Sequence, residues 1–153
     1  MATRLSAPQT VMQTVVAMAE LAIDTPGTGF VDITREAARF LGECRAGDGV
    51  LLLFLRHTSA SLTIQENVDP DVQRDLVTAL ERLAPANAGW RHDVEGPDDM
   101  PAHVKTMLTD VSLHVPVAGG RMQLGTWQAI YLVEHRTRPH RRQVVLQFLG
   151  SGG

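Results

Sequence analysis

The sequence holds only one cysteine, Cys44, so it has no pair that could form an intrachain disulfide. A lone cysteine fits a reducing compartment, and we expect the protein in the cytoplasm. Long apolar runs are also missing, since the longest, residues 50–55 (VLLLFL), is far too short to cross a bilayer. The first residues, MATRLSAPQT, lack the apolar stretch of a secretory signal. We therefore expect no membrane association.

Positive charge is scarce as well. The formal net charge is -3, which gives none of the basic excess that nucleic-acid binding requires, so we expect no nucleic-acid partner. Of the 14 basic side chains only Lys105 is a lysine. Lysine is a compact point charge, unlike the planar arginine fork, and a site that needs such a charge would retain it. Chance is the simpler alternative.

The familiar catalytic motifs are absent from the sequence. It has no GxSxG elbow, no Walker loop, no dinucleotide fingerprint, and no two histidines one helical turn apart with a glutamate between them. A Ser–His–Asp hydrolase could be assembled from Ser59 or Ser61 with His103 and Asp99, but nothing in the spacing favours that choice. Short-range motifs therefore do not identify the chemistry.

The composition fits one globular domain over residues 1–153, because 44% of the residues are hydrophobic and 20% are charged. Residues 50–55 predict a strand buried on both faces. A further short strand follows within RHTSASLTIQEN. Apolar runs and alternation predict the other strands, at residues 10–20, 30–33, 111–117, 127–134 and 143–149.

Three segments show helical spacing. Thr34 is expected to N-cap the first, whose buried face is Ala37, Phe40, Leu41 and Cys44 and which AGDG ends. Asp69-Pro70 opens the second, with a buried stripe of Val72, Leu76, Leu80 and Leu83. Pro101 starts the third, which runs to Leu108. Strands and helices do not alternate strictly, so the expected class is α+β: a mostly antiparallel sheet or sandwich with two to three helices.

The segment HDVEGPDDMPAHVK, residues 92–105, is too polar to serve the core. It carries His92, Asp98, Asp99 and His103, while His57 and Glu134-His135 end two predicted strands. Histidines from separate elements with carboxylates nearby are the ligands of a divalent metal site. Two alternatives remain: histidines at strand ends are often only hydrogen-bonded, and Asp98-Asp99 could cap the helix at Pro101.

A second set of residues favours phosphate. HTSAS offers hydroxyls and small residues, and the glycine turns at residues 119–121 and 125–128 offer backbone donors. Four arginines follow Glu134-His135: Arg136, Arg138, Arg141 and Arg142. A phosphorylated ligand held by a metal and basic groups would fit them. Otherwise the glycines mark hairpins and the arginines are a solvated face.

Six blocks in order, HTSASLT, ENVDPDV, HDVEGPDDMPAHVK, SLHVPV, GGRMQLGTWQ and EHR, resemble the YjbQ family, known as the secondary thiamine-phosphate synthase family. The match covers most of the chain. Asp110, where the family often has glycine, and Ala129, where it usually has GTWQG, depart from its pattern beside the motifs. The resemblance implies a small α+β domain that assembles as a homotrimer around a polar site.

The resemblance also implies the roles of individual residues. The catalytic groups would be His57, His103, Lys105 and Glu134. The metal ligands would be His57, His103 and His135, binding a divalent ion such as Mg²⁺ or Zn²⁺. The substrate-binding residues would be Thr58, Ser59, Glu66, Asn67, His92, Glu95, Asp98, Asp99, Arg121, Trp127, Gln128 and Arg136.

The activity that the family name implies joins a hydroxymethylpyrimidine diphosphate to a thiazole phosphate and releases pyrophosphate. We therefore expect a metal-assisted transferase at a subunit interface, with synthesis of thiamine phosphate as a main or secondary activity. Two other classes stay open. One is a trimer that binds a metal or a phosphorylated metabolite without catalysis, and the other is a metal-dependent hydrolase.

Overall fold

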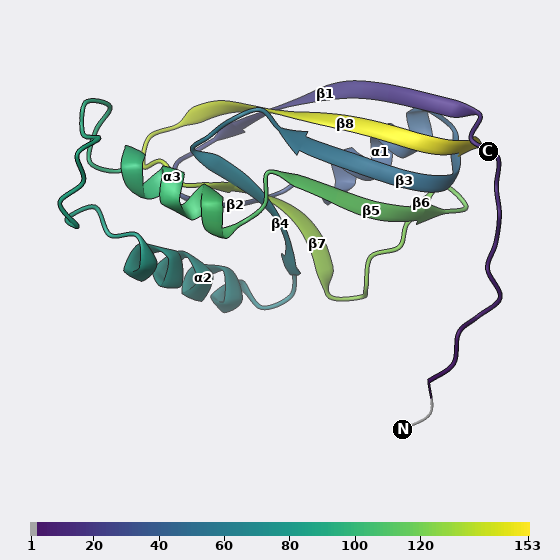
Figure 1. Ribbon diagram of the computed structural model, residues 1–153, viewed down its shortest axis with the longest axis horizontal. Helices are drawn as coiled ribbons and strands as arrows, with labels where there is room; N and C mark the ends of the chain where they lie inside the picture. The colour runs from purple at the N-terminus through teal and green to yellow at the C-terminus, as the bar shows by residue number, and fades with distance from the viewer. Residues whose placement is uncertain (1–2) are drawn as a thin grey trace.

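The computed structural model describes residues 3–153, in which two antiparallel sheets are accompanied by three helices (Figure 1). The larger sheet has the order β1-β8-β3-β5-β6, formed by β1 (Val15–Thr25), β8 (His140–Gly152), β3 (Ala46–Leu55), β5 (Ser112–Ala118) and β6 (Arg121–Met122). The smaller has the order β2-β7-β4, formed by β2 (Gly29–Asp32), β7 (Gln128–Glu134) and β4 (Ala60–Glu66). The predicted α+β class and antiparallel pairing are confirmed.

The helices are α1 (Thr34–Glu43), α2 (Pro70–Leu83) and α3 (Asp99–Leu108). The predicted cap of α2 is confirmed, because the Asp69 carboxylate accepts the backbone N–H of Asp71 at 2.9 Å. The predicted cap of α1 is wrong. Thr34 is the first helical residue, and its hydroxyl accepts the N–H of Ile130 on β7 at 2.8 Å instead of capping the helix. Among residues 3–153, no helix has the length and apolarity that a membrane crossing needs.

The core draws side chains from both sheets and from one face of α1. Alternate residues of β3 (Leu51, Leu53 and Leu55) and of β8 (Val144, Leu146 and Phe148) point inward, as the two-residue period of a strand requires. Ala37, Phe40 and Leu41 of α1 are buried as predicted. The stripe on α2 is only partly buried: Val72, Leu76 and Leu80 are half-buried, and Leu83 is exposed.

The opposite face of the large sheet is uncovered by any other element of the described chain. The prediction that residues 50–55 form a strand buried on both faces is therefore wrong. Leu51, Leu53 and Leu55 are buried, whereas Phe54 is 48% exposed. Val16 and Met18 on β1 lie on the exposed part of the same sheet. An apolar run alone does not distinguish a strand inside a sandwich from one with a free face.

Two strands begin at other residues than predicted because their pairing partners set where they start. β1 starts at Val15, not at residue 10, and continues to Thr25 because it pairs along its whole length with β8. β3 starts at Ala46, inside the AGDG segment that was expected only to end a helix. Pairing partners, which no local pattern reveals, set where both strands begin.

Candidate functional site

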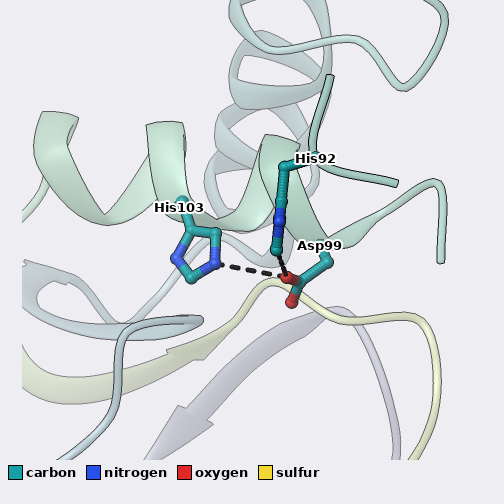
Figure 2. Close-up of side chains that lie close together, drawn as sticks. All are labelled: His92, Asp99 and His103. Carbon is teal, nitrogen blue, oxygen red and sulfur yellow. Dashed lines mark hydrogen bonds and ion pairs between the residues drawn. The ribbon is translucent and has the colours of Figure 1, made fainter. Parts of the chain in front are cut away.

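Residues 92–105, the acidic segment, include the end of the loop after α2 and the first turns of α3, and they bring two histidines onto one carboxylate (Figure 2). Asp99 and His103 lie one turn apart on α3, and His92 reaches the same place from the preceding loop. Asp99 Oδ2 is 2.8 Å from His92 Nε2 and 3.2 Å from His103 Nε2. Asp99 is 2% exposed, whereas His92 is exposed and His103 partly so, which leaves the cluster open to solvent on its histidine side.

The proton on His103 can be placed from its contacts. Its Nδ1 lies 2.9 Å from the carbonyl oxygen of Thr58, which can only accept, so Nδ1 carries a hydrogen. In a neutral ring, Nε2 then presents a lone pair to Asp99 Oδ2. Two acceptors face each other favourably only when they share a cation, either a second proton on the ring or a metal ion. A ring fixed by a backbone carbonyl is also how metal-bound histidines are oriented.

Arg136 binds the carboxylate of Asp99 through Oδ1, the oxygen that the histidines do not contact. Its Nη1 donates to Asp99 Oδ1, its Nε donates to Asp98 Oδ2 at 3.2 Å, and its Nη2 donates to the carbonyl of Glu95 at 2.7 Å. One oxygen of Asp99 is thereby occupied and the other is left to the histidines. Because every nitrogen of its guanidinium bonds to the acidic segment, Arg136 lies in position to hold that segment and not a phosphate.

Both aspartates are kept charged. Partial burial alone would raise the pKa of Asp98, but hydrogen bonds from the Thr137 N–H, Arg136 and the Thr137 hydroxyl lower that pKa to about 2. Burial likewise opposes the charge on Asp99, but the hydrogen bond from His92 and the nearby Arg136 guanidinium hold its pKa below the ordinary value. The capping alternative is not supported, because Asp98 precedes α3 but makes no side-chain cap bond.

Glu134 and Arg142 form a buried ion pair behind the cluster. Glu134 is 0% exposed and also accepts a hydrogen bond from the Thr25 hydroxyl at 2.8 Å. Burial would raise the pKa of Glu134, but the hydrogen bonds from Arg142, the Arg136 N–H and Thr25 outweigh it and lower that pKa. Because Glu134 is enclosed by these hydrogen bonds, its carboxylate is not accessible to solvent.

His57 is held by the same network. Its Nε2 accepts the N–H of Gln143 at 2.9 Å, and its Nδ1 lies 3.5 Å from Arg142 Nη1. Burial and the nearby Arg142 guanidinium lower the pKa of His57. Thr58 and Ser59, which follow, contribute carbonyl oxygens to His103 and Arg142.

His135 and Lys105 lie in the interior on a different side of α3 from His103. His135 Nε2 is 2.8 Å from the Ser61 hydroxyl, and Lys105 Nζ donates to Glu81 on α2. Burial and the nearby Lys105 ammonium lower the pKa of His135 to about 4. Within residues 3–153 the group of ligand atoms close enough to share a metal ion is His92, Asp99 and His103, so His57 and His135 do not join His103. Ser61 also pairs with His135 and not with His103.

Five of the predicted binding residues lie far from this cluster. The register pairs Ala60 with Glu134 at one end of β4 and β7, and Glu66 with Gln128 at the other. At about 3.3 Å per residue, these ends are roughly 20 Å apart. The far group consists of Glu66, Asn67, Arg121, Trp127 and Gln128. Trp127 lies just outside β7 and is 60% exposed.

Sequence reasoning overlooked Thr25 and Glu81, and it placed Arg142 in a basic connection that would either bind a phosphorylated ligand or be a solvated face. One signal could have found Arg142: it shares the two-residue alternation of Val144, Leu146 and Phe148, the inward-facing residues of β8. An arginine on that face must be buried and needs an acidic partner. Thr25 and Glu81 carry no comparable signal, because their partners are distant in sequence.

The cluster offers two imidazole nitrogens and one carboxylate oxygen. Three protein ligands with remaining positions open are the set found where zinc or iron takes part in chemistry. Magnesium prefers oxygen ligands only, so the donors fit Mg²⁺ poorly. A small substrate with oxygen donors could complete such a coordination shell.

Comparison with known proteins gives the class and then the family. Two antiparallel sheets with three helices define a single-domain α+β protein. A protein from Aeropyrum pernix K1 with 27% identity shares this fold, with a TM-score of 0.82 over 88% of this chain and 99% of that chain. Residues 19–151 match the family described as UPF0047 protein YjbQ-like. The chain belongs to the YjbQ/UPF0047 family.

Individual relatives agree with that assignment. A UPF0047 protein of Synechocystis sp. is 44% identical over 132 residues, which are 86% of this chain and 90% of that protein. The UPF0047 protein YjbQ of Escherichia coli O157:H7 is 42% identical over 132 residues, covering 86% and 96%. The crystal structure of a YjbQ/UPF0047 protein from Clostridium acetobutylicum is 35% identical, with a TM-score of 0.80 over 85% of this chain and 98% of that chain.

Proposed function

We propose that the protein is a metal-assisted transferase of the thiamine-phosphate synthase type, with the metal held by His92, Asp99 and His103. One observation carries the proposal: two imidazole nitrogens lie at 2.8 and 3.2 Å from the same oxygen of Asp99, and His103 is fixed through Nδ1 so that Nε2 faces that oxygen. This arrangement is stabilised by a shared cation. The three ligands favour a transition metal such as Zn²⁺ over Mg²⁺.

The protein's own residues position the donors. Arg136 occupies the second oxygen of Asp99 and anchors the acidic segment to the end of β7. Thr58 orients His103 through its carbonyl. When bound, a divalent ion would neutralise charge that gathers on the leaving pyrophosphate. The pyrimidine can carry the developing positive charge, so no protein nucleophile is required.

Assembly and location belong to the same proposal. The uncovered apolar part of the large sheet around Val16 and Met18 on β1 supports association with further copies, because such surfaces are seldom left open to water. We take the assembly to be a homotrimer with a small phosphorylated substrate, located in the cytoplasm. We expect no nucleic-acid partner, since the net charge of -3 gives no overall attraction to a polyanion.

The test is formation of thiamine phosphate from the two phosphorylated precursors, before and after treatment with a chelator. His103→Ala should abolish the reaction, and His140→Ala, a histidine outside the cluster at the start of β8, is the matched control. A main activity should turn over at about 1–10³ s⁻¹. Consumption of a single substrate with water would identify a hydrolase. Ligand-dependent stabilisation without turnover would identify a binding protein.

A further inference from the structure

An open groove lies beside the cluster, along the end of β3 and the HTS turn. Its volume is about 560 Å³, and its lining includes Phe54, Arg56, His57, Thr58, Ser59 and Val111. The groove and the cluster share Thr58, whose carbonyl accepts the Nδ1–H of His103. A molecule in this groove would therefore lie next to the proposed metal ligands.

Phe54 gives the groove an aromatic surface. Its neighbours Leu53 and Leu55 point into the core, so strand alternation turns the Phe54 side chain outward, where it is 48% exposed. Within residues 3–153 no aromatic ring pairs with it. An exposed ring at a groove is a surface on which a flat heterocycle can stack.

Arg56 gives the same groove a positive charge. Two residues after Phe54, it projects from the same face of the strand, and its Nη1 lies 2.9 Å from Glu20 Oε2. Both members of this pair are about half exposed, with side-chain exposures of 57% and 44%. An exposed ion pair contributes little stability, so a phosphate group can take the place of Glu20 at little cost.

We infer that this groove is the binding site for a phosphorylated aromatic heterocycle, with Phe54 stacking on the ring and Arg56 holding the phosphate. The inference deepens the proposed function, on which it rests, by naming the residues that select the substrate. It replaces two of the expected substrate-binding residues, Trp127 and Arg136. Trp127 lies at the far end of β7, and Arg136 is occupied by the acidic segment.

Binding to chelator-treated protein tests the groove independently of the metal. Thiamine phosphate, thiamine and inorganic phosphate serve as probes in calorimetric titrations of full-length protein. Arg56→Met should lower the affinity for thiamine phosphate about tenfold and leave the affinity for thiamine unchanged. Phe54→Leu should lower the affinities for thiamine phosphate and for thiamine about fivefold and leave the affinity for inorganic phosphate unchanged. Glu20→Gln should raise the affinity for thiamine phosphate, because it removes the carboxylate that pairs with Arg56.

Arg74→Met is the matched control, since Arg74 is an exposed arginine paired with Asp71 on α2, away from the groove. It should bind all three probes as the wild type does. Equal affinities in the wild type, Arg56→Met and Phe54→Leu would overturn the inference. A change in molecular mass of Phe54→Leu by light scattering, without a change in thiamine affinity, would also overturn it and assign Phe54 to a subunit contact.

Zn²⁺ titration of the same variants separates this inference from the proposed function. The groove variants should bind Zn²⁺ like the wild type, because none of the changed residues belongs to the His92–Asp99–His103 cluster. Normal Zn²⁺ binding without probe binding would refute the groove alone. Absence of Zn²⁺ binding in the wild type would refute the metal centre and leave the groove to be judged by its own titrations.

Discussion

Arg142 holds both carboxylate oxygens of Glu134, with Nε 2.7 Å from Oε2 and Nη2 2.5 Å from Oε1. The pair spans the connection between β7 and β8, and both side chains are almost fully buried. Thr25 and the backbone of Arg136 bond to the same carboxylate. Glu134, expected to be catalytic, therefore has a structural environment, and it positions the turn from which Arg136 reaches the acidic segment.

Removing Glu134 should destabilise the fold. Glu134→Ala leaves the Arg142 guanidinium buried without a partner, which typically costs about 3–5 kcal/mol in the free energy of unfolding. Urea denaturation would measure the loss. Glu43→Ala is the control, since Glu43 pairs with Arg39 on the surface of α1 and its loss should cost less than about 1 kcal/mol. A similar cost for both variants would contradict the structural role of the buried pair.

Acid should weaken the anchoring of the acidic segment through Asp98. Its pKa is lowered from 3.8 to about 2 in the folded protein. The native state therefore binds this proton less readily than the unfolded state, so the stabilisation is complete above about pH 4 and is lost as the pH falls towards about 2. The difference amounts to at most about 2 kcal/mol.

Asp98→Asn removes that titration. The variant should lose stability at neutral pH, and its free energy of unfolding should fall less steeply than that of the wild type between about pH 4 and pH 2. Chemical denaturation at a series of pH values gives both curves. Parallel curves for the two proteins would show that Asp98 does not have the lowered pKa.

The Lys105–Glu81 pair should respond unequally to substitution of its two members. Lys105 has a side-chain exposure of 3%, whereas Glu81 has 49%. Glu81→Gln leaves a buried ammonium without its counter-ion and should cost about 3 kcal/mol or more. Lys105→Met leaves a glutamate that can turn to water, so the cost should be about 1 kcal/mol or less.

Thermal or urea unfolding of both variants measures the difference. Equal costs would mean that the ion pair does not depend on which charge is buried. Because Lys105 lies away from His92, Asp99 and His103, its replacement should also leave Zn²⁺ affinity unchanged. Loss of Zn²⁺ binding in Lys105→Met would return Lys105 to the site at which it was first expected.

Arg136 should control metal affinity without touching the metal. Arg136→Met frees the second oxygen of Asp99 and releases the loop at Glu95, and losses of about 10–100-fold in affinity are usual when such supporting residues are removed. Arg136→Lys should restore only part of the affinity, because one ammonium cannot reproduce three directed contacts. Zn²⁺ titration measures both variants. Arg138→Met, at an exposed neighbouring arginine, should bind Zn²⁺ normally.

Local patterns predicted the elements of this fold better than their surroundings. The strand at residues 143–149, the cap at Asp69 and three of the four residues expected on the buried face of α1 follow from patterns within one segment, and the structure bears each of them out. The exposure of Phe54 and the start of β1 depend on which strand lies alongside and on what covers the sheet. Such information is spread over the whole chain.

The candidate site shows the same division. The acidic segment was expected to hold a polar site, and three of its residues, His92, Asp99 and His103, lie together in the structure. Its histidine partner was not predictable: His92 contacts Asp99, whereas His57 and His135, equally suited in type, bond to Gln143 and Ser61. A histidine's partner depends on three-dimensional neighbours that its own sequence position does not encode.

Three successive residues at the end of β7 go to three separate partners: Glu134 to Arg142, His135 to Ser61 and Arg136 to the acidic segment. A slip of one residue in the pairing of β7 with β4 would exchange these partners and place a carboxylate where a guanidinium is needed. An insertion or deletion between Val133 and Thr137 should therefore be far more damaging than one in the exposed stretch before Trp90. The loop that carries His92 takes its position from the alignment of a sheet to which it does not itself belong.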